Sequence, residues 1–346
     1  MHDIVKQLSV CFKAPYQVSV QEEAMPSPAP GHVLVQTLVS AISPGTEMLV
    51  YRGQMPPDIP LDATIPSLSS DSIYPLKYGY AAVGRVVAMG QDVLPEWDGR
   101  LVFVLNPHEN CFSIPTAEAH PVPDGISAEE AAFLPNMETA VNFLMDGYPA
   151  IGERVLVFGQ GVVGLLTTAL LSKAPLACLV TLDRYPARRE KSLTLGAQAS
   201  LDPDADDITS QIQSLMQDDE SYQGADLAYE ISGNPASLNQ AIAATGFNGR
   251  VVIGSWYGQK RAELELGGAF HRSRIRLISS QVSTISPELA GRWDRARRLN
   301  LAWSMLQQVR PAHLITHRFP INEAPKAYEL LDQHPQEAIQ VVFTYE

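Results

Sequence analysis

Short hydrophobic runs separated by proline and glycine dominate roughly the first 145 residues of the chain. Runs of this length, bounded by turn-forming residues, are typical of β-strands. Near residue 128 the pattern changes, because Ser127 can cap a helix over 128–132 and a second helix is expected from Glu138 to about Met145. This part of the chain is therefore predicted to form a β-rich, barrel-like domain, with strands at 18–20, 32–35, 84–87 and 100–104.

From about residue 150 to residue 285, short apolar runs alternate with helix-like segments. This alternation predicts right-handed βαβ units, and hence an α/β fold with a doubly wound parallel sheet between two layers of helices. A further helix is expected from Pro287 to about Gln308, with Arg292, Arg295 and Arg298 on its solvated face. The expected strands are 155–158, 179–182, 227–231, 250–253 and 275–278, and the helices between them are 160–172, 188–195 and 235–245.

The composition is that of a globular protein, since 45% of the 346 residues are hydrophobic and 18% are charged. A chain of this length is expected to form two domains. The most apolar stretch, 161–182, is interrupted by Lys173 and Pro175, so a buried helix and a buried strand are expected there rather than a membrane span. The net charge of −13 disfavours binding to nucleic acid or to an anionic membrane.

Only three cysteines occur, Cys11, Cys111 and Cys178, and none belongs to a CxxC motif or a Cys/His cluster. They provide neither a disulfide framework nor a four-cysteine zinc lobe. The N-terminus has no basic segment followed by an apolar run, which predicts that no signal peptide is cleaved. Both observations favour a cytoplasmic protein.

A GxGxxG motif directly follows the apolar run 155–158 and opens an apolar helix. In that context the glycines permit a tight turn, close approach of a pyrophosphate and close packing of helix on strand, and the helix N-terminus favours an anion. Asp183, at the end of the next strand, favours NAD over NADP by accepting the ribose hydroxyls, although arginines from Arg184 onward leave NADP open. The expected cofactor contacts are Gly159, Gly161, Val162, Val163, Gly164, Asp183, Arg184, Ser232, Gly254, His271 and Arg272.

The order of a β-rich half, a glycine-motif half and a short C-terminal return resembles the medium-chain dehydrogenase/reductase superfamily, which contains zinc-type alcohol dehydrogenases and quinone oxidoreductases. The segment 43–53, SPGTEMLVYRG, has the shape of the loop that carries the family's first zinc ligand. The segment 75–86, PLKYGYAAVGRV, matches the PxxxGHExxGxV signature. The resemblance implies a GroES-like catalytic domain over 1–145, completed by 287–346, and a Rossmann domain over 146–286. It also implies a homodimer.

The resemblance further implies that the family's zinc ligands are missing from this chain. The first ligand position falls on Pro44, or on Ser43 if the alignment shifts by one residue, and the second falls on Tyr80. The third falls on Pro135 or Asn136. A catalytic zinc site needs three donors from Cys, His or carboxylate side chains. A zinc-independent, NAD- or NADP-dependent oxidoreductase is therefore expected.

Without zinc, side chains must stabilise or protonate the substrate oxygen, and the alignment offers Tyr80, Thr46 and Asn136. Tyr80 either donates to that oxygen or packs in the space left by the metal. Thr46 either relays a proton or bonds within its turn, and Asn136 either donates to a carbonyl or caps a helix. Glu47 is expected to be structural, for instance paired with an arginine, and histidines such as His108 form no ligand pattern.

Two functions remain open at this point. The first is hydride transfer between the nicotinamide and a carbonyl, alcohol, quinone or enone substrate. The second is binding or sensing of the dinucleotide without catalysis. The segments 270–281 and 292–298 resemble a narrower subgroup that includes the bacteriochlorophyllide hydroxyethyl dehydrogenases, which suggests a bulky or hydrophobic small-molecule substrate.

Overall fold

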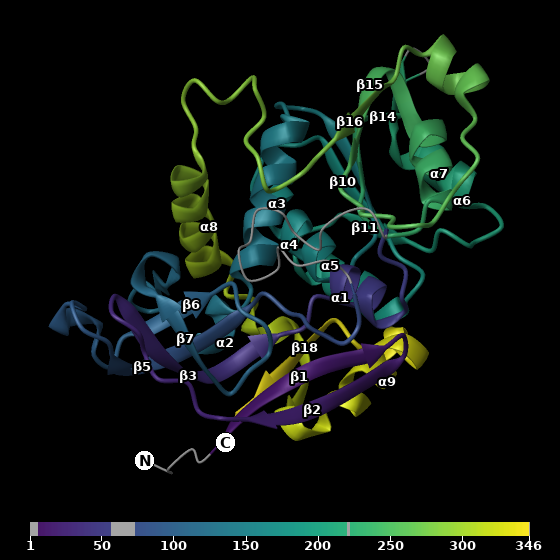
Figure 1. Ribbon diagram of the computed structural model, residues 1–346. Coiled ribbons are helices and arrows are strands. Elements are labelled where there is room, and N and C mark those ends of the chain that lie inside the picture. Colours follow the sequence, from purple (N-terminus) through teal and green to yellow (C-terminus); the bar gives the residue numbers. More distant parts are fainter. Residues whose placement is uncertain (1–5, 57–72, 220–221, 346) are drawn as a thin grey trace. The chain divides into compact units, whose positions relative to one another are not determined.

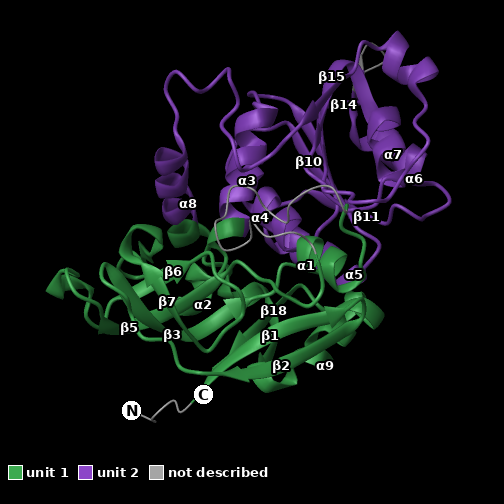
Figure 2. Cartoon of the chain, in the orientation of Figure 1, with its two compact units in different colours: residues 1–135, 306–346 green, residues 136–305 purple. Residues whose placement is uncertain are grey.

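The structure of the protein is a computed structural model, and it describes residues 6–56, 73–219 and 222–345. The chain forms two compact units, which are coloured separately in Figure 2. The first unit comprises residues 1–135 and 306–346, and the second comprises residues 136–305. The first unit is thus discontinuous in sequence, and its boundaries differ from the predicted positions near 145 and 287.

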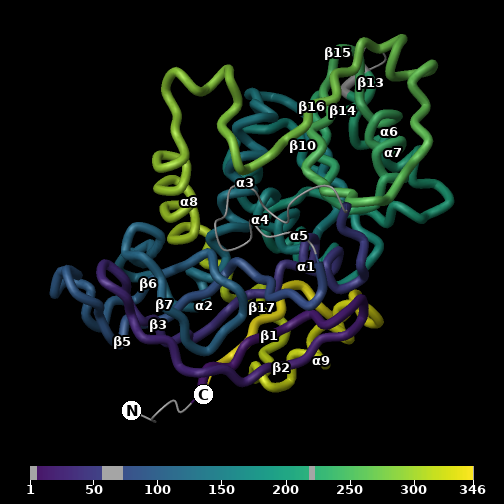
Figure 3. The backbone as a smooth tube through the Cα atoms, viewed as in Figure 1, coloured from purple at the N-terminus to yellow at the C-terminus, as the bar shows by residue number. Residues whose placement is uncertain are grey.

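Two largely antiparallel sheets build the first unit. One has the strand order β2-β1-β4, and the other has the order β17-β18-β3-β5-β6-β8, with β7 also paired to β3. Figure 3 shows the C-terminal segment, in yellow, among the N-terminal strands, in purple, and β18 pairs with β3. The strands are β1 (Gln7–Ala14), β2 (Gln17–Glu23), β3 (His32–Ala41), β4 (Leu76–Lys77), β5 (Ala82–Met89), β6 (Leu101–Val104), β7 (Cys111–Pro115), β8 (His120–Pro121), β17 (Ile315–Pro320) and β18 (Gln340–Thr344). The predicted β-rich half is confirmed.

The helices of the first unit are α1 (Pro44–Tyr51), α2 (Ala128–Ala131) and α9 (Ala324–Gln333). The predicted cap of α2 is present, because the Ser127 hydroxyl accepts from the Glu130 backbone N–H and the Glu130 carboxylate accepts from the Ser127 N–H. Helix α1 was not expected from the apolar pattern. It begins after Ser43 with Pro44 at its first position, where a missing N–H costs no helical hydrogen bond.

The second unit contains a six-stranded parallel sheet with the order β11-β10-β9-β14-β15-β16 (Figure 1). The chain crosses from one half of the sheet to the other between β9 and β14, so the strand order reverses at that pair. The strands are β9 (Arg154–Phe158), β10 (Cys178–Leu182), β11 (Ala199–Leu201), β14 (Ala225–Glu230), β15 (Thr245–Ile253) and β16 (Arg276–Ser279), and a separate hairpin is formed by β12 (Gln217–Asp219) and β13 (Tyr222–Gln223). The predicted doubly wound fold is confirmed.

The helices of this unit are α3 (Leu134–Gly147), α4 (Val162–Leu171), α5 (Pro186–Thr194), α6 (Ile208–Leu215), α7 (Ala236–Ala244) and α8 (Arg295–Val309). The apolar stretch 161–182 forms α4 and β10, as predicted. Among the helices of the described residues, none is both long and apolar enough to cross a membrane.

The prediction for the helix near the end of this unit was wrong in two respects. Helix α8 begins at Arg295 rather than Pro287, because residues 287–292 form turns. Arg298 was expected on the solvated face, but its side chain is completely buried. It forms an ion pair with Glu138 at 3.0 Å and donates to Asn142 Oδ1 at 2.6 Å. These partners on α3 lie far away in sequence, so the periodicity of α8 alone could not reveal them.

Candidate functional site

The glycine motif forms the expected tight turn between β9 and α4. Gly159 has φ +96°, which favours glycine, and a Cβ added there would lie 2.5 Å from Ser232 Cα. A Cβ on Gly164 would lie 2.0 Å from the Gly159 carbonyl oxygen, so α4 packs directly against the turn. Gly161 caps α4 without a side chain, and nothing lies within 4 Å of the position that its Cβ would occupy. The first N–H groups of α4 at Val162 and Val163 are therefore exposed to an anion that approaches Gly161.

Asp183 connects this turn to the end of β10. Its Oδ2 accepts from the Gln160 backbone N–H at 2.7 Å, and its Oδ1 accepts from the Tyr185 N–H at 2.9 Å. A carboxylate has about four lone-pair sites, so two remain for ribose hydroxyls. Arg184, in contrast, forms an exposed ion pair with Asp204 at 2.9 Å.

The arginines after Asp183 differ in their surroundings. Arg188 lies over the Tyr185 ring at 4.8 Å, and burial lowers the pKa of its guanidinium while Asp183 opposes that effect. Arg189 donates to the Asp183 carbonyl at 2.8 Å and pairs with Asp202 at 3.0 Å. The segment that follows β10 is therefore held in place by its own arginines.

The remaining predicted cofactor residues lie beyond the ends of β14 and β15. Ser232 follows β14 and packs against the glycine turn, since a Cβ added to Gly159 would lie 2.5 Å from Ser232 Cα. Gly254 follows β15, where an added Cβ would lie 2.2 Å from the Phe143 ring. His271 and Arg272 are exposed on the connection between β15 and β16. Ser232 and Gly254 thus belong to the carboxyl edge of the sheet, where a doubly wound fold binds its ligand.

In the first unit, three hydroxyl groups gather at the beginning of α1. The Tyr80 hydroxyl donates to Ser43 Oγ and lies 3.3 Å from Thr46 Oγ1. Of the two alternatives for the first zinc-ligand position, Ser43 is the one whose side chain contacts Tyr80. Asn136 lies in the second unit, as the third residue of α3, and so is inside a helix rather than at its cap.

Glu47 has partners other than the arginine that was expected. Its Oε2 lies 3.0 Å from His108 Nε2 and accepts from the Tyr328 hydroxyl at 2.6 Å, while its Oε1 accepts from the Ser43 N–H at 2.7 Å. Glu47 and His108 are both completely buried. Burial and the Glu47 carboxylate raise the pKa of Tyr328, which keeps its phenol protonated. Glu47 therefore holds the beginning of α1, and with it Ser43, from within the core.

Sequence reasoning also missed His108, because it lies in a loop with no recognisable motif. Its Nδ1 lies 2.6 Å from Ser40 Oγ, which in turn contacts the Tyr345 hydroxyl at 2.6 Å. In the sequence, His108 is recognisable only as a loop residue after the strand that ends at Val104, and that position does not indicate which side chains it contacts.

The residues near Tyr80 do not fit a zinc site. Ser43 and Thr46 supply hydroxyls in hydrogen-bond contact with Tyr80, and none of these is a usual protein ligand of zinc. Among the residues that the structure describes, no group of three or more His, Cys, Asp or Glu side chains could hold a metal ion.

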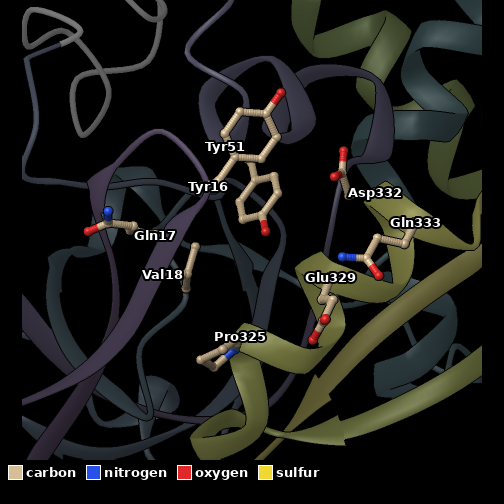
Figure 4. Close-up of a pocket in the computed structure, with 8 residues that line it drawn as sticks. All are labelled: Tyr16, Gln17, Val18, Tyr51, Pro325, Glu329, Asp332 and Gln333. Carbon is tan, nitrogen blue, oxygen red and sulfur yellow. The ribbon is translucent and has the colours of Figure 1, made fainter.

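A separate cavity of about 520 Å³ lies at the other end of α1 (Figure 4). Tyr16 and Tyr51 line it, with ring centroids 5.4 Å apart, and Glu329 and Asp332 contribute carboxylates from α9. Asp332 pairs with Arg52 at 2.7 Å. Ser43 and Thr46 lie at the beginning of α1, whereas Tyr51 lies at its end. This cavity is therefore distinct from the cluster of the Tyr80, Ser43 and Thr46 hydroxyls.

Comparison with known proteins shows similarity over nearly the whole chain. Residues 162–297 match the family described as zinc-binding dehydrogenase. D-guloside 3-dehydrogenase of Escherichia coli is 23% identical over 273 residues, which is 77% of this chain and 77% of that protein. The 2-desacetyl-2-hydroxyethyl bacteriochlorophyllide A dehydrogenase of Cereibacter sphaeroides is 26% identical over 343 residues, or 94% of each chain.

Solved structures share the fold. An alcohol dehydrogenase from Escherichia coli, complexed with NADH, superposes with a TM-score of 0.78 at 18% identity. The match covers 98% of this chain and 99% of the other. The two chains therefore share the same fold.

Proposed function

We propose that this chain, a member of the medium-chain dehydrogenase/reductase superfamily of zinc-type alcohol dehydrogenases, is an NAD(P)-dependent dehydrogenase that works without zinc. The observation that carries the proposal is the cluster formed by the hydroxyls of Tyr80, Ser43 and Thr46, where the family holds its metal. The reaction is hydride transfer between the nicotinamide and the carbon of an alcohol or carbonyl group.

The glycine turn supports the cofactor part of the proposal. The free N–H groups at the start of α4 and the open space beside Gly161 fit a dinucleotide pyrophosphate. When bound, the nicotinamide accepts or donates the hydride. NAD is the preferred cofactor, because the Asp183 carboxylate offers acceptors to ribose hydroxyls and repels a 2′-phosphate.

Tyr80 is proposed to hold the substrate oxygen. In the structure the Tyr80 hydroxyl donates to Ser43 Oγ. In the direction of carbonyl reduction, this proton turns from Ser43 to the substrate oxygen that gains negative charge, and the Ser43 or Thr46 hydroxyl then donates to the phenol oxygen. Relatives that act on guloside and on a bacteriochlorophyllide support a secondary alcohol as the reacting group.

The test is a steady-state assay of purified protein with NAD⁺ or NADP⁺ and a panel of secondary alcohols and glycosides, and of the matching carbonyls with NADH. Activity that persists after removal of zinc by a chelator, with zinc absent by elemental analysis, is expected. The Tyr80→Phe variant should lower kcat about 100-fold or more. The variant Tyr16→Phe, which changes an exposed tyrosine in the same unit, should not. Binding of the dinucleotide without turnover of any substrate would favour a sensor instead, and zinc at one equivalent in the active protein would overturn the zinc-free mechanism.

A further inference from the structure

Glu230 is a buried carboxylate at the carboxyl end of the central strand β14, and the proposed reaction does not use it. It is completely buried. Its Oε1 accepts from the Ser232 backbone N–H at 3.0 Å and from the Ser232 hydroxyl, and its Oε2 accepts from the Tyr257 hydroxyl. All three partners are donors, as an ionised carboxylate requires.

The partners of Glu230 are neutral. No ion pair joins it to a basic side chain among the residues that the structure describes. Lys260, three residues after Tyr257, donates to the Gly233 carbonyl at 2.8 Å. Burial and the Glu230 carboxylate raise the pKa of Tyr257, so the phenol does not add a second negative charge. The three donors stabilise the carboxylate by hydrogen bonds, and they do not cancel its charge as a paired cation would.

The position of Glu230 in the sheet determines which part of a bound dinucleotide lies near its negative charge. Glu230 lies opposite Phe158 of β9 and Ile253 of β15 in the strand register. A doubly wound sheet holds one mononucleotide on each half, with the crevice where the strand order reverses. The half with β9, β10 and Asp183 is the one that holds the adenosine. Glu230 therefore belongs to the half that holds the nicotinamide nucleotide.

We propose that Glu230 makes the oxidised cofactor bind more tightly, relative to the reduced cofactor, than it otherwise would. Oxidised nicotinamide carries a positive charge on its ring, whereas reduced nicotinamide is neutral. A carboxylate beside the crevice attracts only the first of these forms, and its loss should change their affinity ratio by about three- to tenfold. Glu230 is thus a residue that determines specificity for the oxidation state of the cofactor. The inference rests on the proposed function, because it needs a bound nicotinamide.

The experiment compares dissociation constants by calorimetry for NAD⁺, NADH and ADP-ribose, which lacks the nicotinamide, in three proteins. These are the unaltered chain, Glu230→Gln and Glu190→Gln. The control removes an exposed carboxylate of α5 in the same unit. In Glu230→Gln the affinity for NAD⁺ should fall about three- to tenfold relative to NADH, while ADP-ribose binding stays the same. Glu190→Gln should leave all three constants unchanged.

Two outcomes would overturn the inference. One is an unchanged NAD⁺ to NADH ratio in Glu230→Gln. The other is an equal gain for all three ligands, which would mean that the carboxylate acts on the pyrophosphate instead. Failure of the unaltered chain to bind NAD(H) or NADP(H) at all would refute the proposed function, and that result is distinct from both.

A measurement on the unaltered chain keeps the inference testable if Glu230→Gln does not fold. Benzamide adenine dinucleotide has the shape of NAD⁺ but a neutral ring. The chain should bind NAD⁺ about three- to tenfold more tightly than this analogue. Equal affinities for NAD⁺ and the analogue would contradict an electrostatic effect of Glu230 on the nicotinamide ring.

Discussion

The Nε2 atom of His108 lies 3.0 Å from Oε2 of Glu47, and both side chains are completely buried. Glu47 belongs to α1 and His108 to the loop before β7, so their contact joins two distant parts of the first unit. The second oxygen of Glu47 holds the Ser43 N–H at the beginning of α1. The buried pair therefore sets the position of the residue that Tyr80 contacts.

Removal of one member of this pair should destabilise the protein strongly. In His108→Leu, Glu47 stays buried and its Oε2 loses the contact with the imidazole, while the Tyr328 hydroxyl still donates to that oxygen. Breaking a buried pair in this way costs about 3–5 kcal/mol of unfolding free energy. Urea denaturation should show the loss. The exposed His313, changed to Leu, serves as the control and should shift the stability by less than about 0.5 kcal/mol. Equal transition midpoints for the two variants would contradict a structural role for the pair.

Two glycines of the turn after β9 should respond differently to the same added methyl group. In Gly164→Ala the Cβ would lie 2.0 Å from the Gly159 carbonyl oxygen, so α4 must move away from the turn, and both stability and dinucleotide binding should fall. In Gly161→Ala nothing lies within 4 Å of the new Cβ, so the protein should keep its thermal midpoint. Binding of NADH should nevertheless weaken at least tenfold, because the methyl group occupies the space where the pyrophosphate approaches.

Fluorescence titration with NADH and thermal unfolding together check this pair of variants. A Gly161→Ala protein that binds NADH as tightly as the unaltered chain would show that the pyrophosphate lies elsewhere. The two variants thus separate packing of the turn from its contact with the ligand.

Glu153 should make the stability of the protein depend on acid pH. Burial is the largest single influence on Glu153 and raises its pKa. The hydrogen bonds from Arg250 and from the Ala150 N–H, together with the charge of Arg250, outweigh burial, so the pKa is lowered from its ordinary value. The two Arg250 amino groups lie 2.8 Å from the two carboxylate oxygens. Because the pKa is lower in the folded state, the stabilisation is present above the unfolded pKa and is lost as the pH falls through the folded pKa.

The prediction is that the urea midpoint of the unaltered chain falls more steeply between roughly pH 5 and pH 3 than that of Glu153→Gln. Exposed Glu190, changed to Gln, should leave the steepness unchanged. Parallel curves for the unaltered chain and Glu153→Gln would show that the Arg250 pair does not control the acid response.

Much of the fold follows from local patterns in the sequence. The runs at 155–158, 179–182 and 250–253 became strands of the parallel sheet, and the GxGxxG segment became the turn into α4. Local rules succeeded there because strand and turn preferences depend on neighbouring residues. They failed at Arg298, where a basic residue with a surface-like pattern is buried against Glu138 and Asn142.

The candidate site shows the same division. The sequence by itself determined that a GxGxxG turn follows a strand and that Asp183 ends the next strand, and its resemblance to the family predicted that the zinc ligands are missing. Only the tertiary structure decided that Ser43 rather than Pro44 contacts Tyr80, that Glu47 pairs with His108, and that Tyr257 holds Glu230. The physical reason is that backbone conformation depends on short-range sequence, whereas the partner of a buried polar group depends on strand register and on the packing of segments that lie far apart in the chain.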